Sequence, residues 1–439
     1  MSFFKSVFKF LRLSTYDKLL EKSGKYFVYN NIKDIETFQV RRFNEIWTLA
    51  YTKIPFYIEY KKKNNLPDKI QSLDELAKFP IITKKDLQYN YKKLLRNDSS
   101  PTGTTMSGGS TGEPLKLPTK GKNEDPGANM WIGRFLYGVE PHDKTFVIWG
   151  HRHLNGKGFS RVMKTFLRDI KDYLSNYKRV SAYDLSQQAM EKIYKEMVDF
   201  KPQFILGYSS ALVTFCKMNR GKELPFNVKS VMCTASTLNS DDQRLIENFF
   251  HASVCKEYGS HETAVMAGTV PSSGNYRVFW DTHILQGVEE NGMVKNIVTV
   301  LMDSYFPVIR YDIGDYIVVD EDSNLNNILE IKDVIGRPND VLVFSNGASF
   351  NCIFTAGCVK QVKSVVSHQI HKYEDGIDVW IVALEKVSKD DLLYIKKLII
   401  DLCPSIKDLK VNVSQVDNLQ QSVAGKTPLV IKHEEKIKL

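Results

Sequence analysis

The sequence predicts an α/β protein with a large, multi-layered N-terminal domain and a small C-terminal α+β domain. Its 439 residues exceed the length of an ordinary single domain. From about residue 100 to 335, short β-branched runs alternate with helical stretches, which is typical of a largely buried sheet covered by helices. After Gly336 the pattern changes to strand, helix, strand, which predicts a compact βαβ unit. We therefore expect domains at 1–335 and 336–439, joined by a linker near Ile335–Asp340.

Individual elements of both predicted domains can be read from the sequence. The predicted strands of the large domain are Thr145–Trp149, Phe204–Leu206, Ser230–Cys233 and Asn296–Leu301. Its predicted helices are Ser186–Phe200 and Asp241–Phe250, after a mainly helical region at 15–95 in which Thr83 caps a helix. The small domain is predicted to hold the strands Ile377–Leu384 and Lys410–Val416 around the helix Lys389–Leu402, with Ser388 as its cap and Pro404 at its end.

Composition excludes several classes of protein. Hydrophobic residues make up 43% of the chain and charged residues 25%, values typical of globular proteins. No run approaches the roughly 18 apolar residues of a membrane-spanning helix. The six cysteines are scattered singly, without a C-x-x-C pair, and no secretory signal is evident. This pattern argues against a disulfide framework and indicates the cytoplasm.

Positive charge is concentrated in the first hundred residues, which hold 20 Lys and Arg against 11 Asp and Glu. No nucleic-acid-binding motif accompanies this charge, so we expect no nucleic-acid partner. Within residues 1–13, Phe3, Phe4, Val7, Phe8 and Leu11 fall on one helical face. Such a helix either lies in a membrane interface, at the inner face of the membrane, or packs its aromatic stripe on the domain.

A glycine-rich segment carries the strongest local signal for chemistry. Its residues are Ser107, Gly108, Gly109, Ser110, Thr111 and Gly112. Glycines let backbone amides approach an anion closely, and the hydroxyls add hydrogen-bond donors, so the segment is suited to bind a polyphosphate. No lysine follows the last glycine, which disfavours a Walker-type P-loop. Taken alone, the segment could also be a flexible turn.

Four further motifs follow in a fixed order. They are Glu257-Tyr258-Gly259-Ser260-His261-Glu262, Pro307–Asp315 with an acid after a glycine turn, Gly336-Arg337-Pro338-Asn339-Asp340, and Gly425-Lys426-Thr427. Each has an ordinary reading when taken singly: Glu262 as a helix-start acid, Asp315 as a turn residue, Arg337 in a surface ion pair and Lys426 as a solvated lysine. As one set they indicate a nucleotide site.

These motifs resemble the adenylate-forming superfamily, and within it the branch of phenylacetate-CoA ligase and CapK-like proteins. The resemblance runs from about Ile54 to Lys426, and the segments Phe79–Leu87 and Lys201–Ser210 support the branch. It implies a large adenylation domain, a small lid domain, and ATP and Mg²⁺ as cofactors, with CoA as a candidate acceptor.

The resemblance also implies roles for individual residues. The segment Ser107–Gly112, with Thr111 among the catalytic candidates, would hold the β- and γ-phosphates, and Glu262 would coordinate Mg²⁺. Tyr258, with Gly259 and Ser260, would line the adenine site opposite Ala235, Ser236 and Thr237. Asp315 and Arg337 would contact the ribose, and Lys426 the transferring α-phosphate. His151 and His261 are candidates for the acyl pocket; His151 with His153 could instead be a metal pair or ordinary core or surface histidines.

Three departures shape the functional hypothesis. Relatives often carry an acid where this chain has Ser236, and an acid or lysine at the hinge where it has Asn339. Residues 341–350 also lack the Arg-Gly-Val-Asn-like stretch of phenylacetate ligases. These differences favour the CapK-like group over a phenylacetate-CoA-ligase-like synthetase. We expect carboxylate activation to acyl-AMP, then acyl transfer to CoA, a carrier thiol or a sugar amine or hydroxyl in surface polysaccharide synthesis. The alternatives are a nucleotide-binding scaffold without catalysis and a membrane-associated polyanion binder.

Overall fold

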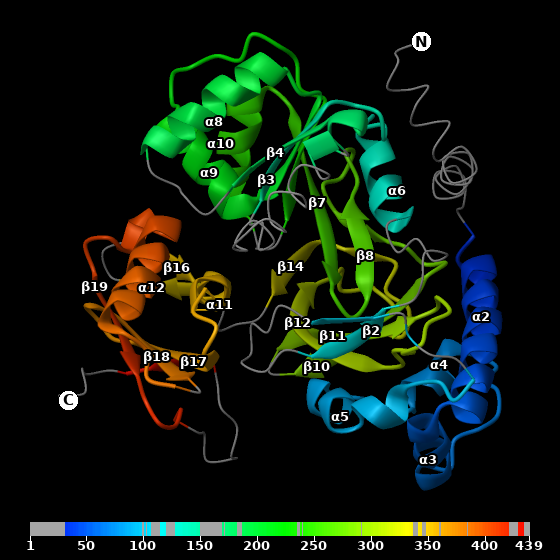
Figure 1. Cartoon of the computed structure of the whole chain (residues 1–439). Helices are drawn as coiled ribbons and strands as arrows, with labels where there is room; N and C mark the ends of the chain where they lie inside the picture. Colours follow the sequence, from blue (N-terminus) through cyan, green and yellow to red (C-terminus); the bar gives the residue numbers. More distant parts are fainter. Residues whose placement is uncertain are drawn as a thin grey trace. The chain divides into compact units, whose positions relative to one another are not determined.

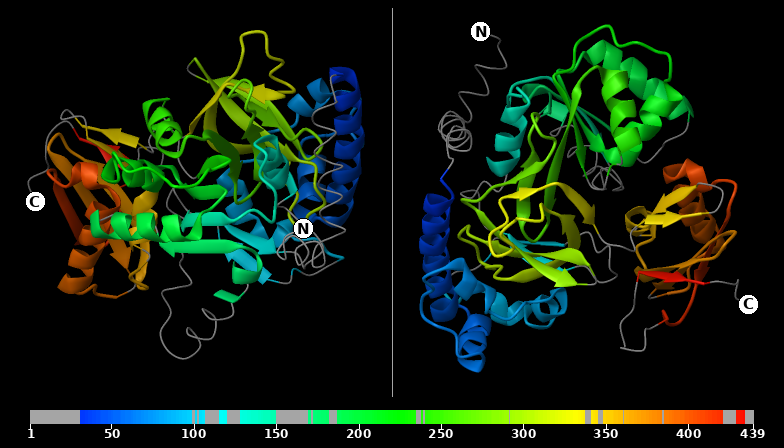
Figure 2. Two further views of the ribbon diagram at one scale, coloured as in Figure 1. Left: turned by 90° about the horizontal axis from the view of Figure 1, so that it is seen from above. Right: turned by 180° about the vertical axis from the view of Figure 1, so that it is seen from behind.

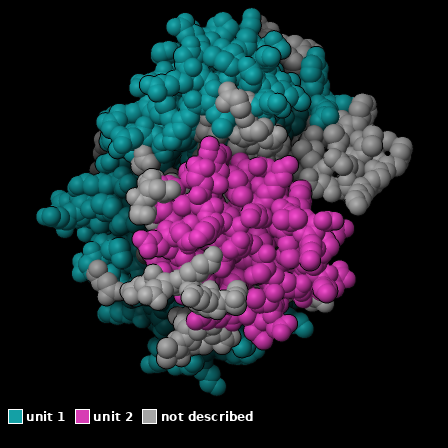
Figure 3. Space-filling view, turned by 90° about the vertical axis from the view of Figure 1, so that its left-hand side faces the viewer, with its two compact units in different colours: residues 1–105, 117–182, 187–336 teal, residues 106–116, 183–186, 337–439 magenta. Residues whose placement is uncertain are grey.

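The computed structural model describes most of the chain, in two compact units. The described residues are 31–98, 101, 103–106, 115–119, 128–149, 169–170, 172–181, 187–234, 238, 240–290, 292–336, 341–344, 348–359, 361–383, 385–420 and 429–433. One unit contains most of the chain up to Gly336, and the other is formed mainly by Arg337–Leu439 (Figure 3). The interpretation of 1–335 and 336–439 as an adenylation domain and a lid stays a prediction. Ile335, the predicted start of the linker, lies in a strand.

The first unit begins with helices, as predicted for this region. They are α2 (Ile32–Lys53), α3 (Pro55–Lys63), α4 (Leu73–Ala77), α5 (Lys84–Tyr89) and the 3-10 turn η1 (Tyr91–Leu94). The predicted cap at Thr83 is confirmed: its hydroxyl accepts the amide hydrogen of Asp86, whose carboxylate accepts the Thr83 amide in return. Residues 1–30, including the predicted amphipathic segment, lie outside the described residues. No described helix is long and apolar enough to cross a bilayer.

An eight-stranded sheet forms the core of this unit (Figure 1). In spatial order its strands are β13 (Glu330–Ile331), β9 (Tyr276–Val278), β8 (Ala264–Thr269), β7 (Ser253–Ser260), β6 (Ser230–Thr234), β5 (Phe204–Tyr208), β3 (Thr145–Trp149) and β4 (Tyr177–Ser181). The strands from β4 to β7 are parallel, and from β7 onward the pairing is antiparallel. The helices beside this sheet are α6 (Ala128–Leu136), α8 (Gln187–Phe200), α9 (Ser209–Met218) and α10 (Ser240–Phe250). Buried residues such as Phe146, Ile205 and Val231 account for the continuous apolar runs of the parallel strands.

A second, antiparallel sheet completes the first unit. Its strands, in order, are β10 (His283–Glu290), β11 (Met293–Val300), β12 (Tyr311–Val318) and β14 (Asp333–Gly336). The helices α3, α4 and α5 lie beside it (Figures 1 and 2). A two-stranded ribbon of β1 (Gly103–Met106) and β2 (Lys116–Thr119) accompanies these sheets.

The second unit is a small α+β fold, as predicted. Its sheet has the order β19 (Lys410–Gln415), β18 (Gly376–Ala383), β17 (Val365–Lys372) and β20 (Val430–Lys432). The predicted βαβ unit is confirmed, because β18 and β19 are parallel and α12 (Lys389–Leu402) connects them. Ser388 accepts the amide hydrogen of Asp391 and the 3-10 turn η3 (Pro404–Ile406) follows the helix. The ribbon β15 (Val341–Val343) with β16 (Ser349–Asn351) and the helix α11 (Ile353–Val359) complete the unit.

Candidate nucleotide site

In the sequence, several predicted site residues of the first unit lie at the end of a parallel strand or shortly after one. His151 follows the end of β3, Ala235–Thr237 follow β6, and Tyr258 lies near the end of β7. The register pairs Cys233 of β6 with Lys256 of β7, so both strands run toward the same edge. Open parallel sheets bind ligands beyond this edge. His151 and Ala235–Thr237 lie outside the described residues, so their roles stay predictions.

Glu262 lies in the tight turn between β7 and β8. The Ser260 hydroxyl accepts the amide hydrogens of Glu262 and Thr263, each at 3.2 Å, which fixes the turn. A nitrogen of the buried His283 ring, Nε2, lies 2.7 Å from the Thr263 carbonyl oxygen and ties the turn to β10. The Glu262 carboxylate is half-buried and has no hydrogen bond or ion pair with another described residue. A carboxylate left uncommitted by its surroundings is suited to a hard cation.

Gly259 is required by the close approach of β8 to this turn. A side-chain carbon at this position would lie 2.8 Å from Cα of Val265 and closer still to the Ala264 carbonyl oxygen. Real Cβ atoms do not approach backbone so closely. The glycine between Tyr258 and Ser260 therefore serves the geometry of the hairpin. His261, the other acyl-pocket candidate, is exposed at the tip of the turn.

Tyr258 and Asp315 are joined directly, although 56 residues separate them in the chain. The Tyr258 hydroxyl lies 3.1 Å from Oδ2 of Asp315, linking β7 of the large sheet to β12 of the antiparallel sheet. Only 6% of Tyr258 is exposed, whereas Asp315 is half-buried. The structure thus brings together the predicted adenine and ribose residues, while stacking on adenine stays a prediction.

The expected glycine turn before Asp315 is a bulge inside a strand. Gly314 has φ +84°, and its amide hydrogen is accepted by Oδ1 of Asp312 at 2.8 Å. The register of β11 and β12 slips here, which is typical of a β-bulge with a left-handed glycine. A turn and a bulge both place a glycine at this position, so the sequence cannot distinguish them until the partner strand is known.

The segment around Ile82 supports the start of β12. Ile82 donates its amide hydrogen to the Arg310 carbonyl oxygen at 2.9 Å, and its own carbonyl oxygen accepts the Asp312 amide hydrogen at 2.9 Å. The buried Arg310 guanidinium donates to the carbonyl oxygens of Phe79, at 2.6 Å, and Ala77. The segment Phe79–Leu87, which supports the branch, and the segment Pro307–Asp315, which holds the predicted ribose residue, are therefore packed together in the structure.

Several predicted residues lie outside the described part of the chain. They are Ser107, Gly108, Gly109, Ser110, Thr111, Gly112, His151, Ala235, Ser236, Thr237, Arg337 and Lys426. Described residues near Arg337 and Lys426 make the following contacts. Gly336, directly before Arg337, pairs with Tyr316, directly after Asp315. Before Lys426 in the chain, the Gln420 carbonyl oxygen accepts a hydrogen bond from the Gln369 side-chain amide at 2.9 Å. After it, the Leu429 carbonyl oxygen accepts the Ile370 amide hydrogen at 2.8 Å. Their roles stay predictions.

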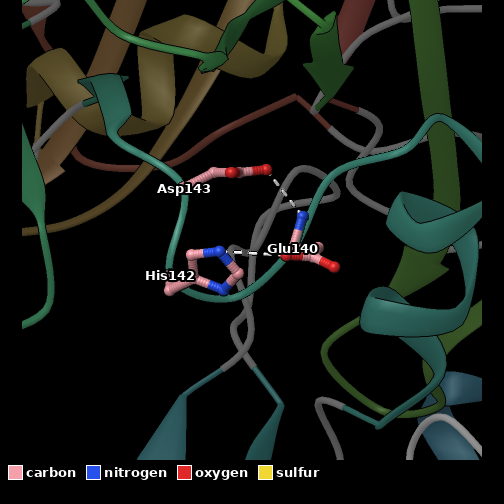
Figure 4. A group of neighbouring side chains, drawn as sticks. All are labelled: Glu140, His142 and Asp143. Atoms are coloured by element: carbon pink, nitrogen blue, oxygen red, sulfur yellow. Dashed lines mark hydrogen bonds and ion pairs between the residues drawn. The ribbon is translucent and has the colours of Figure 1, made fainter. Parts of the chain in front are cut away.

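Glu140, His142 and Asp143 form a compact group of potential metal ligands in the turn before β3 (Figure 4). The Asp143 carboxylate already accepts the Glu140 amide hydrogen at 2.7 Å and pairs with Lys229 at 2.8 Å. His142 Nε2 lies 2.9 Å from the Glu140 carboxylate. Because these atoms hold one another and Lys229, the group fastens a turn, and we assign it a structural role.

Comparison with known proteins agrees with this arrangement. No family model matches the chain. The protein CapK of Staphylococcus aureus is 24% identical over 374 residues, which cover 83% of this chain and 82% of CapK. A 2-hydroxyisobutyryl-CoA ligase, solved with 2-HIB-AMP and CoA in the thioesterification state, aligns with a TM-score of 0.58 at 15% identity. The alignment covers 92% of this chain and 91% of that one. The same ligase in a postadenylation state, with R3-HIB-AMP, aligns with a TM-score of 0.52 at 14% identity over 90% and 89% of the two chains.

The chain has the adenylate-forming fold. The predicted fold class and the resemblance to this superfamily and its CapK-like branch are confirmed.

Sequence reasoning missed one residue of this site. Asn296 of β11 is fully buried and its side-chain amide donates to the Tyr258 hydroxyl at 2.9 Å. In the sequence it is only a polar residue next to Lys295, within the mainly apolar stretch Met293–Val300. A buried amide within such a run is a signal worth following, because burying it costs free energy unless it is bonded.

Proposed function

We propose that this protein is an AMP-forming ligase that activates a carboxylic acid with ATP and Mg²⁺. In the first step a carboxylate oxygen attacks the α-phosphorus of ATP, and the bond to the β-phosphate breaks. The products are acyl-AMP and pyrophosphate. In the second step a nucleophile attacks the acyl carbon and AMP leaves. The observation that carries the proposal is the direct bond between Tyr258 and Asp315, two motif residues distant in sequence, at the sheet edge where this architecture binds ligands.

The residues of this chain would divide the work as their motifs imply. Magnesium, when bound, would neutralise charge on the phosphates, and the uncommitted carboxylate of Glu262 is a suitable ligand for it. Asp315 would accept hydrogen bonds from the ribose hydroxyls, since an ionised carboxylate is a strong acceptor. The segment Ser107–Gly112 would donate to the β- and γ-phosphates, and Lys426 would contact the α-phosphate in the transition state.

The acyl acceptor is proposed from the relatives. CoA is a candidate because the 2-hydroxyisobutyryl-CoA ligase with this fold was solved with CoA bound. The other candidates are a carrier thiol and an amine or hydroxyl on a sugar. The proposed pathway is capsule or surface polysaccharide synthesis, as the resemblance of the motifs to the CapK-like branch implies. The residues 336–439 would act as a lid that brings Lys426 to the site.

The proposed setting is the cytoplasm, with peripheral contact of residues 1–13 at the inner face of the membrane. All six cysteines are free thiols, and five of them are buried. Burial raises the pKa of the Cys255 thiol to about 12, which keeps it protonated and unreactive. Unpaired, inert cysteines are typical of proteins from a reducing compartment.

Pyrophosphate release tests the proposal. Purified protein with Mg-ATP is offered a panel of aryl, fatty, hydroxy and amino acids, and Glu262→Gln and Lys426→Ala are compared with wild type. We expect release that depends on one class of acid and falls at least about a hundredfold in both variants, the size of effect seen when a transition-state contact is removed. Matched controls are Glu289→Gln and Lys407→Ala, which change exposed residues and leave release intact. ATP binding without release for any acid would favour a nucleotide-binding scaffold instead.

A further inference from the structure

Three polar side chains form a continuous chain of hydrogen bonds between the two sheets of the first unit. Asn296 of β11 donates from Nδ2 to the Tyr258 hydroxyl oxygen at 2.9 Å, and that hydroxyl lies 3.1 Å from Oδ2 of Asp315. Asn296 is 0% exposed and Tyr258 6%, so two of the three groups are screened from water. Hydrogen bonds in such surroundings are stronger than at a surface.

The chemistry of these groups fixes the direction of the chain. The Tyr258 hydroxyl has one hydrogen, and it accepts from the Asn296 amide, so its own hydrogen is available for Asp315. A carboxylate can only accept, which gives the order Asn296 to Tyr258 to Asp315. The carbonyl oxygen of the Asn296 side chain has no hydrogen-bond partner among the described residues. The Asn296 side chain is thus oriented so that its NH₂ group donates to Tyr258, although this leaves its buried carbonyl oxygen without a donor among the described residues.

The bulge in β12 lies directly opposite Asn296. Lys295 pairs with Tyr316 and Ile297 pairs with Asp312, so residues 313–315 share the space opposite Asn296 alone. Bulges re-aim side chains and are common beside active sites. In an unbroken register Asp315 would pair with Val294, whereas the two extra residues of the bulge leave it opposite Asn296.

We infer that Asn296 and the Tyr258 hydroxyl are positioning residues that hold the Asp315 carboxylate for recognition of the ribose hydroxyls. This inference rests on the proposed function. The Tyr258 hydroxyl donates to Oδ2 of Asp315, and a carboxylate offers about four lone-pair sites, so one carboxylate can accept hydrogen bonds from several donors at once. A carboxylate held by a fixed donor loses less rotational freedom when the nucleotide binds.

Binding of ATP and of 2′,3′-dideoxy-ATP, measured by isothermal titration calorimetry, tests the inference. Dideoxy-ATP keeps the adenine and the phosphates but lacks the two ribose hydroxyls from which Asp315 would accept hydrogen bonds. Tyr258→Phe removes the hydroxyl and keeps the ring, and Asn296→Leu removes the donor at similar volume. Tyr276→Phe is the matched control, because it removes a hydroxyl from an equally buried tyrosine on the same sheet that is not part of the chain of bonds.

We expect both variants to lose about tenfold in affinity for ATP, as for one hydrogen bond to a charged group, and to bind dideoxy-ATP as wild type does. Tyr276→Phe should bind both nucleotides like wild type. An equal loss for both nucleotides, or no loss for ATP in Tyr258→Phe, would overturn the inference. Wild type that binds the two nucleotides equally overturns it while leaving ATP binding in place, whereas wild type that binds neither refutes the proposed function itself.

Discussion

Replacing Gly259 by alanine should displace the turn that carries Glu262. The added carbon would lie 2.8 Å from Cα of Val265 and 3.0 Å from the Ala264 carbonyl carbon, and closer still to that carbonyl's oxygen. All three atoms belong to the backbone, so no side chain can turn away to make room. Relief requires the β7–β8 hairpin to open by several tenths of an ångström, and such overpacking costs about 1–3 kcal/mol in the free energy of unfolding.

Differential scanning calorimetry measures this cost. The first unit has about 320 residues, so at about 2 cal/mol/K of unfolding entropy per residue each kcal/mol lowers Tm by about 1.5 °C, and a cost of about 2 kcal/mol lowers it by about 3 °C. Gly133→Ala is the matched control: the new carbon meets only Phe279, at 3.8 Å, and the site is in the helix α6. Because alanine is a better helix former than glycine, Gly133→Ala should leave Tm unchanged or raise it slightly. An unchanged Tm in Gly259→Ala would refute the argument that backbone contact demands glycine here.

Two further predictions concern buried side chains that can carry a charge. Arg310→Met removes a buried guanidinium that donates to the carbonyl oxygens of Phe79 and Ala77, and should lower the free energy of unfolding by about 3 kcal/mol, measured as a lower Tm. In the second unit, burial and the neighbouring His433 lower the pKa of His371 to about 4. The folded state then binds fewer protons than the unfolded state between about pH 4 and 6.5, so stability should fall as pH drops through that range. His371→Gln should flatten this dependence in thermal unfolding followed from pH 4.5 to 7.5, and an unchanged slope would contradict the assignment.

Local patterns predicted the elements well where one physical signal dominated. Thr145–Trp149 and Lys389–Leu402 were predicted with the bounds that the structure shows, the first from a β-branched run and the second from a capped amphipathic helix. The cap at Thr83 was also readable, because a capping box depends only on residues three positions apart. These signals depend only on residues close in sequence, so the surrounding tertiary structure does not alter the element that they predict.

Contacts between distant segments could not be read in this way. The prediction of a glycine turn at Gly314 was wrong in kind, because a bulge is defined by the partner strand, and only the register with Lys295 and Ile297 reveals it. The bond of Tyr258 to Asp315 was likewise invisible, although both residues were selected for a nucleotide. Motifs identified which residues matter, and the sheet topology determined which of them meet.

The role of Asn296 follows from combining both kinds of information. On sequence alone, an asparagine between Lys295 and Ile297 is an imperfection in a strand, since asparagine is depleted in strands and costly to bury. In the structure it lies opposite the bulge and donates to the hydroxyl that contacts Asp315. The polar residue and the irregular register, each unfavourable alone, thus act on the same carboxylate. Local violations of propensity that converge on one group are expected at functional sites, and this convergence is the reason to look for ribose recognition there.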